Sequence, residues 1–297
     1  MKIQETGSLM DTIAQTRLER RRFLTQAGMV GLGAAATLTL GSQKASAAAE
    51  SPAQRAQEKA QAKDTVKEIF TAALIAEDLA TTFYYHGLVG GVIQDMNLAG
   101  PGGSANNVQP NGNAGNVQYL QAALTEEIAH ADLFRSLLGI SSPAADPVQT
   151  FYFPAGSFDT LAAFTGLLDA LENAFIGAYL NAIQEFSVKS AHEDDDGEGS
   201  KYTARQLDYF AKVAASIMGI EAEHRVLGRV ISNSNPANNL AYEQTDGLNA
   251  VYNGPKSAVA ALTPFLTPST GPGFSLATAL AKQGTVSIAV TGNPPAF

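Results

Sequence analysis

The chain has 297 residues, of which 45% are hydrophobic and 16% are charged. That composition is enough to bury a sizeable core and is unlike that of a disordered chain. No Cys is present, which excludes disulfides, iron–sulfur clusters and thiolate zinc sites. The formal net charge is −9, and residues 48–297 hold 13 basic and 25 acidic side chains. Such a surface repels nucleic acid and anionic lipid and attracts cations, so we expect no nucleic-acid partner.

The first 47 residues have the pattern of a signal peptide. A basic region at 20–22 is followed by Phe23 and Leu24, an apolar run at 28–40 and small residues at 45–47. This order is typical of secretory signals, and paired arginines followed by x-Phe-Leu resemble the bacterial twin-arginine signal. The alternative is a membrane anchor, but this Gly- and Ala-rich run is too short to span a bilayer. We therefore expect export by the twin-arginine route to the periplasm or another extracytoplasmic space, with no membrane span after processing.

Apolar residues that recur with a period of 3.6 indicate four long helices in the remainder of the chain. The expected ranges are about 52–87, 116–139, 157–189 and 203–232. Ser157 is a candidate N-cap for the third helix. The pattern therefore predicts an all-α fold.

Residues that favour loops lie between these helices. The first connection, 89–116, is rich in Gly, Asn and Pro, and the second is a crossover with Pro143, Pro147 and Pro154. The third is an acidic turn at 192–199, which we interpret as solvated, with weak cation binding as the alternative.

These patterns divide the chain into three parts. Residues 1–47 are the signal peptide, 48–235 the helical bundle, and 236–297 a C-terminal extension of short helix and irregular segments. The extension has an apolar stretch at 258–266 and a candidate strand near 286–290.

The sequence Glu-x-x-His occurs twice, each time within a predicted helix, and each preceding helix carries a lone glutamate near its middle. Residues three apart lie on one face of a helix, so each Glu and His can point into the bundle core together. Four helices that contribute Glu, Glu-x-x-His, Glu and Glu-x-x-His provide the ligands of a carboxylate-bridged two-metal site. The six candidate ligands are Glu77, Glu127, His130, Glu172, Glu221 and His224.

The predicted helix ends place these ligands at one depth. Glu77 lies about 10 residues before its helix end and Glu127 about 11 after the next start. Glu172 lies about 17 residues before its end and Glu221 about 18 after the following start. At about 1.5 Å per residue, both pairs match to within roughly one turn.

A buried site of carboxylates and imidazoles without sulfur favours Fe, Mn or Zn over copper(I) or clusters. Four buried carboxylates would repel one another unless protonated, whereas two divalent cations neutralise them. Two such ions could bind O₂ or peroxide between them. Fe and Mn both accept this ligand set.

The motif order closely resembles that of the ferritin-like superfamily over about residues 60–235. Within it, the chain looks like the exported branch, which includes bacterial ferritin-like proteins with twin-arginine signals and the plant desiccation-related proteins. The resemblance implies a four-helix bundle with a long crossover between helices 2 and 3, and two Fe or Mn ions that handle O₂, peroxide or Fe²⁺. We expect Glu127 and Glu172 as bridging candidates, with His130 and His224 each ligating one metal.

Three functions fit this site. The first is a di-metal oxidoreductase that consumes peroxide or oxidises Fe²⁺ in oxidative or desiccation stress. The second is iron sequestration, which needs a hollow homo-oligomeric shell that the long first loop and irregular tail suit poorly. The third is a stress-protective protein that keeps the metal site for stability and has no catalytic activity.

Other polar residues compete with these assignments. Glu126 lies four residues before His130 and is a rival to Glu127, which we prefer because it reproduces the spacing of Glu221 and His224. No Ser–His–Asp arrangement is suggested.

Four other polar residues lie near the candidate ligands in the sequence. Glu223 is expected to be a solvated charge, and Asp169 is a candidate to orient a histidine. Tyr84 and Tyr179 each lie seven residues after a predicted ligand. Each could bond a ligand, although the simpler interpretation is an ordinary core tyrosine. His86 and His192 have no acidic partner at ligand spacing and are expected at the surface.

Overall fold

A computed structural model describes residues 64–191, 201–238, 247–248 and 258–287. The predicted signal peptide, the first residues of the first predicted helix, His192 with the acidic turn, and residues 288–290 of the candidate strand lie outside these ranges.

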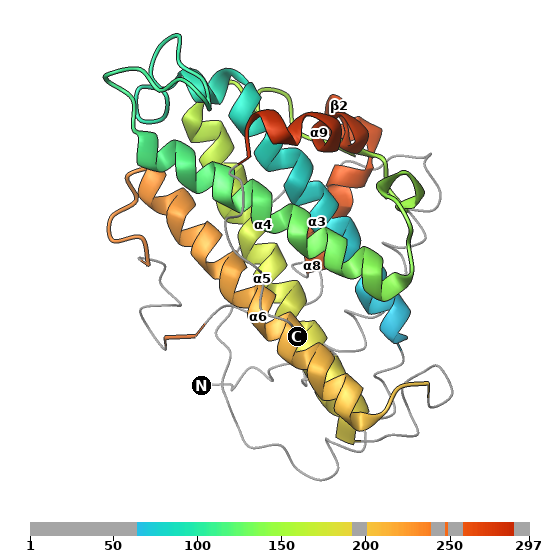
Figure 1. Ribbon diagram of the computed structural model, residues 1–297. Helices are drawn as coiled ribbons and strands as arrows, with labels where there is room; N and C mark the ends of the chain where they lie inside the picture. The colour runs from blue at the N-terminus through green and yellow to red at the C-terminus, as the bar shows by residue number, and fades with distance from the viewer. Residues whose placement is uncertain (1–63, 192–200, 239–246, 249–257, 288–297) are drawn as a thin grey trace, which may run out of the picture.

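Four long helices form a bundle: α3 (Val66–Val89), α4 (Ala114–Leu138), α5 (Leu161–Ala191) and α6 (Ala204–Ile231) (Figure 1). They pack most closely as two hairpins, α3 with α4 and α5 with α6. The crossover from α4 returns along the bundle, so α5 begins at the same end as α4 (Figure 1). The predicted all-α bundle with a long crossover between its second and third helices is confirmed.

Side-chain caps determine where these helices begin. Thr65 and Glu68 form a capping box at the start of α3, and Thr203 and Gln206 form one at the start of α6, where each satisfies orphan backbone N–H groups. The α4 helix ends at Gly139, whose φ of 71° is readily adopted by glycine.

The predicted N-cap of α5 is wrong. The hydroxyl of Ser157 donates to the carbonyl of Pro154 within a turn before the helix. The hydroxyl of Thr160 instead accepts from the backbone N–H of Ala163, and α5 begins at Leu161. The turn after Pro154 therefore holds Ser157 four residues before Leu161, the first residue of the helix.

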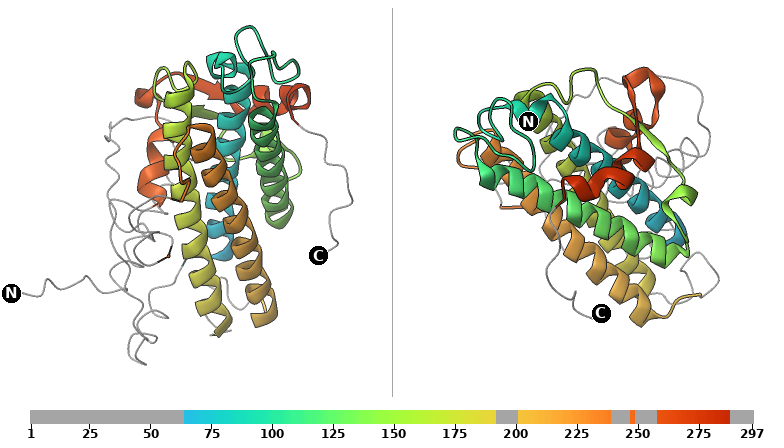
Figure 2. Two further views of the ribbon diagram at one scale, coloured as in Figure 1. Left: turned by 90° about the vertical axis from the view of Figure 1, so that its left-hand side faces the viewer. Right: turned by 45° about the horizontal axis from the view of Figure 1, so that its top comes forward.

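Short elements cover one side and one end of the bundle. The crossover contains strand β1 (Thr150–Tyr152), which pairs antiparallel with β2 (Gly273–Ser275), so that Phe151 lies opposite Phe274. Helix α9 (Leu276–Lys282) follows β2 and lies against α3, as the upper part of Figure 1 and the right view of Figure 2 show. The C-terminal extension is thus joined to the crossover by a small sheet.

The remaining elements are short helices. The apolar stretch at 258–266 forms α8 (Ala258–Leu262) and the 3-10 helix η4 (Thr263–Leu266). The other 3-10 helices are η1 (Gly91–Gln94), η2 (Pro143–Ala145), η5 (Pro268–Thr270) and η6 (Gln283–Thr285).

The candidate strand near 286–290 is wrong at its two described residues. The N–H groups of Val286 and Ser287 bond the carbonyl of Gln283. This is a turn that continues η6, and it leaves neither N–H for a strand partner.

The buried apolar side chains form two clusters, one toward each end of the bundle. One cluster contains Leu79, Leu124 and Phe175 together with the crossover and the C-terminal elements. The other contains Phe70 and Phe134 with further residues of α5 and α6. A layer of buried polar side chains lies where the two clusters meet.

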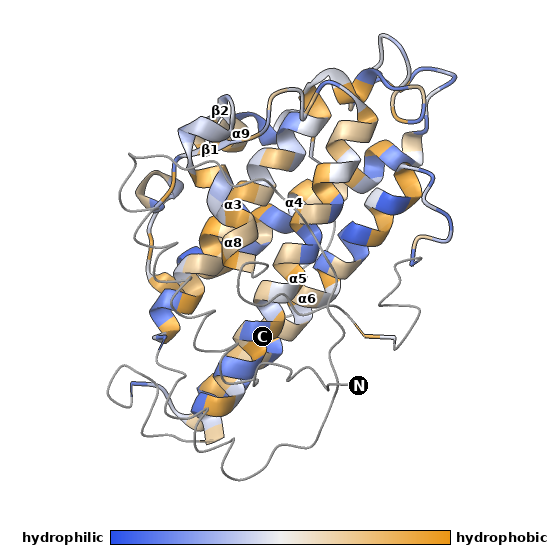
Figure 3. Cartoon of the chain, turned by 180° about the vertical axis from the view of Figure 1, so that it is seen from behind, coloured by the Kyte–Doolittle hydropathy of each residue, from blue (hydrophilic) through white to orange (hydrophobic). Residues whose placement is uncertain are grey.

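The α5 helix is long and apolar enough, by length and composition, to cross a membrane. Most of its apolar window is buried inside the bundle, and a core helix is expected to have this composition. Figure 3 shows apolar residues on α8 and the adjoining parts of α3 and α5.

Gly87 marks a close approach of α3 to α5. A Cβ atom at this position would lie 2.4 Å from the Phe164 ring, and that ring is fully buried. We expect Gly87→Ala to destabilise the protein, since overpacking typically costs about 1–3 kcal/mol and exceeds the gain of about 1 kcal/mol in helix propensity.

Gly166 is the matched control, because a Cβ there would meet nothing within 4 Å. We expect Gly166→Ala to raise stability by about 0.5–1 kcal/mol. Denaturant unfolding monitored by circular dichroism measures both changes. Equal effects of the two substitutions would contradict the close packing at Gly87.

Candidate metal centre

The four helices carry the predicted ligands at one depth below the same end of the bundle. Glu77 lies 12 residues before the end of α3, and Glu127 lies 13 after the start of α4. Glu172 lies 11 residues after the start of α5, and Glu221 lies 10 before the end of α6. At about 1.5 Å per residue, these heights agree to within about one helical turn.

His130 connects ligands from three helices. Its Nδ1 atom lies 3.2 Å from Glu77 Oε2 and 3.5 Å from Glu221 Oε1. The same nitrogen lies 3.9 Å from Glu127 Oε2, one turn earlier on its own helix. The imidazole therefore points into the space between the carboxylates.

His224 occupies the corresponding place on the other side. Its Nδ1 atom lies 3.0 Å from Glu127 Oε1, 3.5 Å from Glu221 Oε2 and 3.9 Å from Glu172 Oε1. Its Nε2 atom hydrogen-bonds Glu126 Oε2 at 2.9 Å. Glu126, whose side chain is 45% exposed, is therefore the outer partner of His224, an arrangement that holds the ring's Nδ1 toward the cluster.

The six residues form two overlapping groups whose ligand atoms lie within 4.8 Å of one another. One group is Glu77, Glu127, His130 and Glu221, and the other is Glu127, Glu172, Glu221 and His224. Each group thus has one histidine. Glu127 and Glu221 belong to both groups.

This sharing changes one expectation. The two carboxylates that belong to both groups, and could therefore serve a cation in each, are Glu127 and Glu221, one from each Glu-x-x-His motif. Glu172 lies in a single group and is not placed to bridge. Both shared residues lie on the pair of helices, α4 and α6, that also supply the histidines, a relation that spacing along one helix does not reveal.

Two tyrosines hold the unshared glutamates. The Tyr84 hydroxyl on α3 donates to Glu172 Oε1 on α5 at 2.6 Å. Reciprocally, the Tyr179 hydroxyl on α5 donates to Glu77 Oε1 on α3. The interpretation of these residues as ordinary core tyrosines is wrong, and the seven-residue spacing from each glutamate was the pattern that pointed to this role.

In each hairpin a buried arginine near the cluster forms an ion pair with aspartate. Arg135, five residues after His130, pairs with Asp78 and Asp146. In the second hairpin, Arg229 Nε donates to Asp169 Oδ1 at 2.7 Å. Asp169 therefore binds an arginine and does not orient a histidine as proposed from its spacing.

Two other expectations concern residues outside the cluster. Glu223 is exposed, as expected. His86 is half-buried and packs against Phe158 and Phe274, so its expected surface position is wrong. Burial lowers the pKa of His86 to about 4. Phe274 belongs to the C-terminal extension, which is far from His86 in the sequence and meets it only when the chain folds.

The hydrogen bonding of the cluster atoms indicates whether cations fit this site. Both oxygens of Glu127 and of Glu221, Oε2 of Glu172 and Nδ1 of His224 are buried without a hydrogen bond to any described residue. Several lie within 4 Å of an imidazole nitrogen, but the groups are not oriented to hydrogen-bond. Buried polar atoms left in this way are costly unless a ligand satisfies them. Two divalent cations would supply the missing charge and coordination, so the residues fit such ions.

Without a cation, protons stabilise the cluster. Burial raises the pKa values of Glu77 and Glu172 well above the ordinary value. Burial would also raise that of Glu127, but the nearby imidazoles of His130 and His224 hold it at about 2. Burial lowers the pKa values of both histidines, yet the surrounding carboxylates raise them to well above the ordinary value of 6.5.

These shifts predict that the metal-free protein loses stability as the pH rises. Because folding raises the histidine pKa values, protonation of these histidines stabilises the fold fully at pH values below 6.5, their ordinary pKa. This stabilisation is lost as the pH rises through the raised pKa values of the folded protein. The raised pKa values of Glu77 and Glu172 also make the protein less stable as the pH rises above 4.5, the ordinary pKa of glutamate. Glu127 opposes them only at acidic pH, between 4.5 and about 2. Each proton involved contributes a slope of about 1.4 kcal/mol per pH unit.

Thermal unfolding between about pH 6.5 and 8.5 measures this effect. We expect Tm to fall across this range in chelator-treated protein and to stay nearly constant after Mn²⁺ is added. Glu172→Gln, which replaces a proton-binding group with a neutral amide, should flatten the metal-free profile. Identical profiles with and without Mn²⁺ would show that the cluster does not couple to a cation.

Residues 65–194 match a family model described as a ferritin-like domain. The match spans α3, α4 and α5, and hence four of the six clustered residues, while α6 with Glu221 and His224 follows it. Searches among curated proteins and solved structures found no match. The match agrees with the four-helix bundle and the buried Glu/His cluster, and it supports a ferritin-like domain over the matched residues.

Proposed function

We propose that this chain is an exported protein that holds two Fe or Mn ions and uses them to handle peroxide, O₂ or Fe²⁺ during oxidative or desiccation stress. The observation that carries the proposal is the pair of overlapping ligand groups that share Glu127 and Glu221. A site for one ion would need one of these groups alone. Two groups with common carboxylates favour a binuclear centre.

Each residue would have a distinct part in binding. Glu77 and His130 would hold one ion, and Glu172 and His224 would hold the other. Glu127 would face both ions together with Glu221. When bound, Fe or Mn would supply electron exchange with oxygen species.

The other side chains would set the positions of these ligands. The Tyr84 and Tyr179 hydroxyls fix one oxygen of Glu172 and of Glu77. Among the described residues the second oxygen of Glu172 has no hydrogen-bond partner, while that of Glu77 faces His130 Nδ1 inside the cluster. Glu126 holds the Nε2 atom of His224, which keeps Nδ1 available inside. The apolar clusters on either side of the layer would limit access of water, and a dry site strengthens its electrostatic interactions.

The sharing of ligands predicts a pattern of metal loss among isosteric variants. Wild-type protein should carry about two ions per chain. Glu127→Gln and Glu221→Gln should retain fewer than one, since each removes a ligand from both positions. Glu77→Gln and Glu172→Gln should retain about one, since each affects a single position. Elemental analysis of natively exported protein measures these contents and identifies the metal.

Peroxide-decay and Fe²⁺-oxidation assays on the same samples test the activity. We expect turnover to fall with metal content across the series. Glu223→Gln is the matched control, because Glu223 is an exposed carboxylate two residues from Glu221. Wild-type protein with less than one metal per chain would remove the proposal. Two tightly bound metals without peroxide or Fe²⁺ turnover would favour the non-catalytic, stress-protective alternative.

The proposed export depends on the N-terminal arginines. Changing both Arg20 and Arg21 to Lys should cause the chain to accumulate in the cytoplasm, because the twin-arginine signal is read by a receptor and not by charge alone. Arg17→Lys, outside the pair, is the control and should leave export unchanged. Cell fractionation measures the distribution, and equal export of all three proteins would contradict this route.

A further inference from the structure

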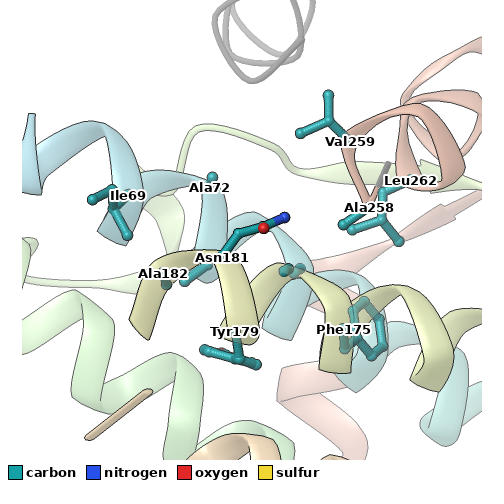
Figure 4. A pocket seen from close by; sticks show the side chains of 12 residues that line it. Ile69, Ala72, Phe175, Tyr179, Asn181, Ala182, Ala258, Val259 and Leu262 are labelled. Carbon is teal, nitrogen blue, oxygen red and sulfur yellow. The ribbon is translucent and has the colours of Figure 1, made fainter. Parts of the chain in front are cut away.

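A small cavity lies between α3, α5 and α8, on the side of the bundle that the C-terminal extension covers (Figure 4). Its volume is about 50 Å³. Since one water needs about 10–15 Å³ measured in this way, the cavity has room for roughly three or four non-hydrogen atoms. Alanines on α3 and α5 form much of its wall, and these small side chains leave the space between the two helices.

The wall is apolar, with the exception of two residues. Val259 and Leu262 of α8 lie on one side, and Ile69 of α3 lies on another. An apolar cavity of this kind favours a small alkyl group over water. The polar lining residues are Asn181 and Tyr179.

Asn181 lies in this wall with an unused hydrogen-bond donor. The residue is 8% exposed, and its Nδ2 atom has no hydrogen-bond partner among the described residues. Figure 4 shows the amide of Asn181 directed from α5 into the space below α8. A buried N–H group without an acceptor is unfavourable, so a ligand that brings an acceptor oxygen would satisfy it.

The cavity adjoins the metal-ligand cluster through Tyr179. The Tyr179 ring forms part of the cavity wall, and its hydroxyl donates to Glu77 Oε1. Ala76, the residue before Glu77, lines the same cavity. Tyr179 thus both lines the cavity and bonds a member of the cluster.

We propose that this cavity binds a small molecule made of a short alkyl group and a hydroxyl or hydroperoxyl group whose oxygen accepts a hydrogen bond. Short-chain alcohols and alkyl hydroperoxides of the same size share this chemistry. The alkyl group would contact the alanines and α8, and the oxygen would accept from Asn181 Nδ2. Only the naming of hydroperoxides rests on the proposed function, since binding of an alcohol needs no metal.

Ethanol and ethyl hydroperoxide are suitable probes for full-length protein with ¹³C-labelled alanine methyl groups. In the wild type, titration of either should shift the Ala72, Ala73 and Ala182 methyl signals to saturation, with a dissociation constant in the millimolar range or weaker. Val259→Phe, which fills the cavity from α8, should abolish these shifts. Val226→Phe, the same change at an exposed position on α6, should leave them intact.

Asn181→Leu keeps the side-chain size and removes the donor. It should weaken ethanol binding by about fivefold to tenfold, the usual effect of one hydrogen bond. Ala72→Leu fills the cavity from α3 and replaces Val259→Phe if that variant does not fold. Shifts that fail to saturate, or that persist in the filled variant, would overturn the proposal. Unchanged affinity in Asn181→Leu would overturn the part assigned to Asn181.

The titrations are repeated on metal-free and Mn²⁺-loaded protein to separate the two proposals. Ethanol binding without any peroxide turnover would overturn the proposed function and support the cavity. Peroxide turnover without ethanol binding would overturn the cavity proposal and support the proposed function. Ethanol binding without ethyl hydroperoxide binding would overturn the hydroperoxides as ligands and support the alcohols.

Discussion

The burial of four carboxylates in one layer is the constraint on which this bundle depends. Glu77, Glu127, Glu172 and Glu221 are fully or almost fully buried, so bulk water screens their charges only weakly. Positive charge must enter the layer, either as protons on the histidines and two of the glutamates or as cations. Once this positive charge neutralises the carboxylates, the polar layer can remain in the core between the two apolar clusters.

The two hairpins meet this constraint with nearly the same set of groups. Each supplies a lone Glu, a Glu-x-x-His pair, and a Tyr that binds the Glu of the other hairpin. Each also places an arginine five residues after its histidine. The helices pack most closely within each hairpin, and the cluster lies between the hairpins. Cations held there would therefore stabilise the assembly of the two halves.

The departure from this symmetry lies on one side of the bundle. The C-terminal extension pairs its strand with the crossover and places α8 against α5. It also brings Phe274 onto His86 and closes the cavity that Asn181 faces. The inner layer is thus provided by the bundle alone, while the surroundings of Glu77 and Tyr179 depend on the extension as well.

The six clustered residues and the helices that carry them could be predicted from sequence, because helical spacing is local and the ligand residue types are few. The sequence also indicated the tyrosines at seven-residue spacing, though not their partners. Which carboxylates are shared by the two ligand groups, the binding of Asp169 to Arg229 and the burial of His86 depend on contacts between helices far apart in the chain. The pairing of β1 with β2 and the cavity under α8 are of the same kind. No local pattern contains such contacts, since they form only when the hairpins, the crossover and the extension pack together.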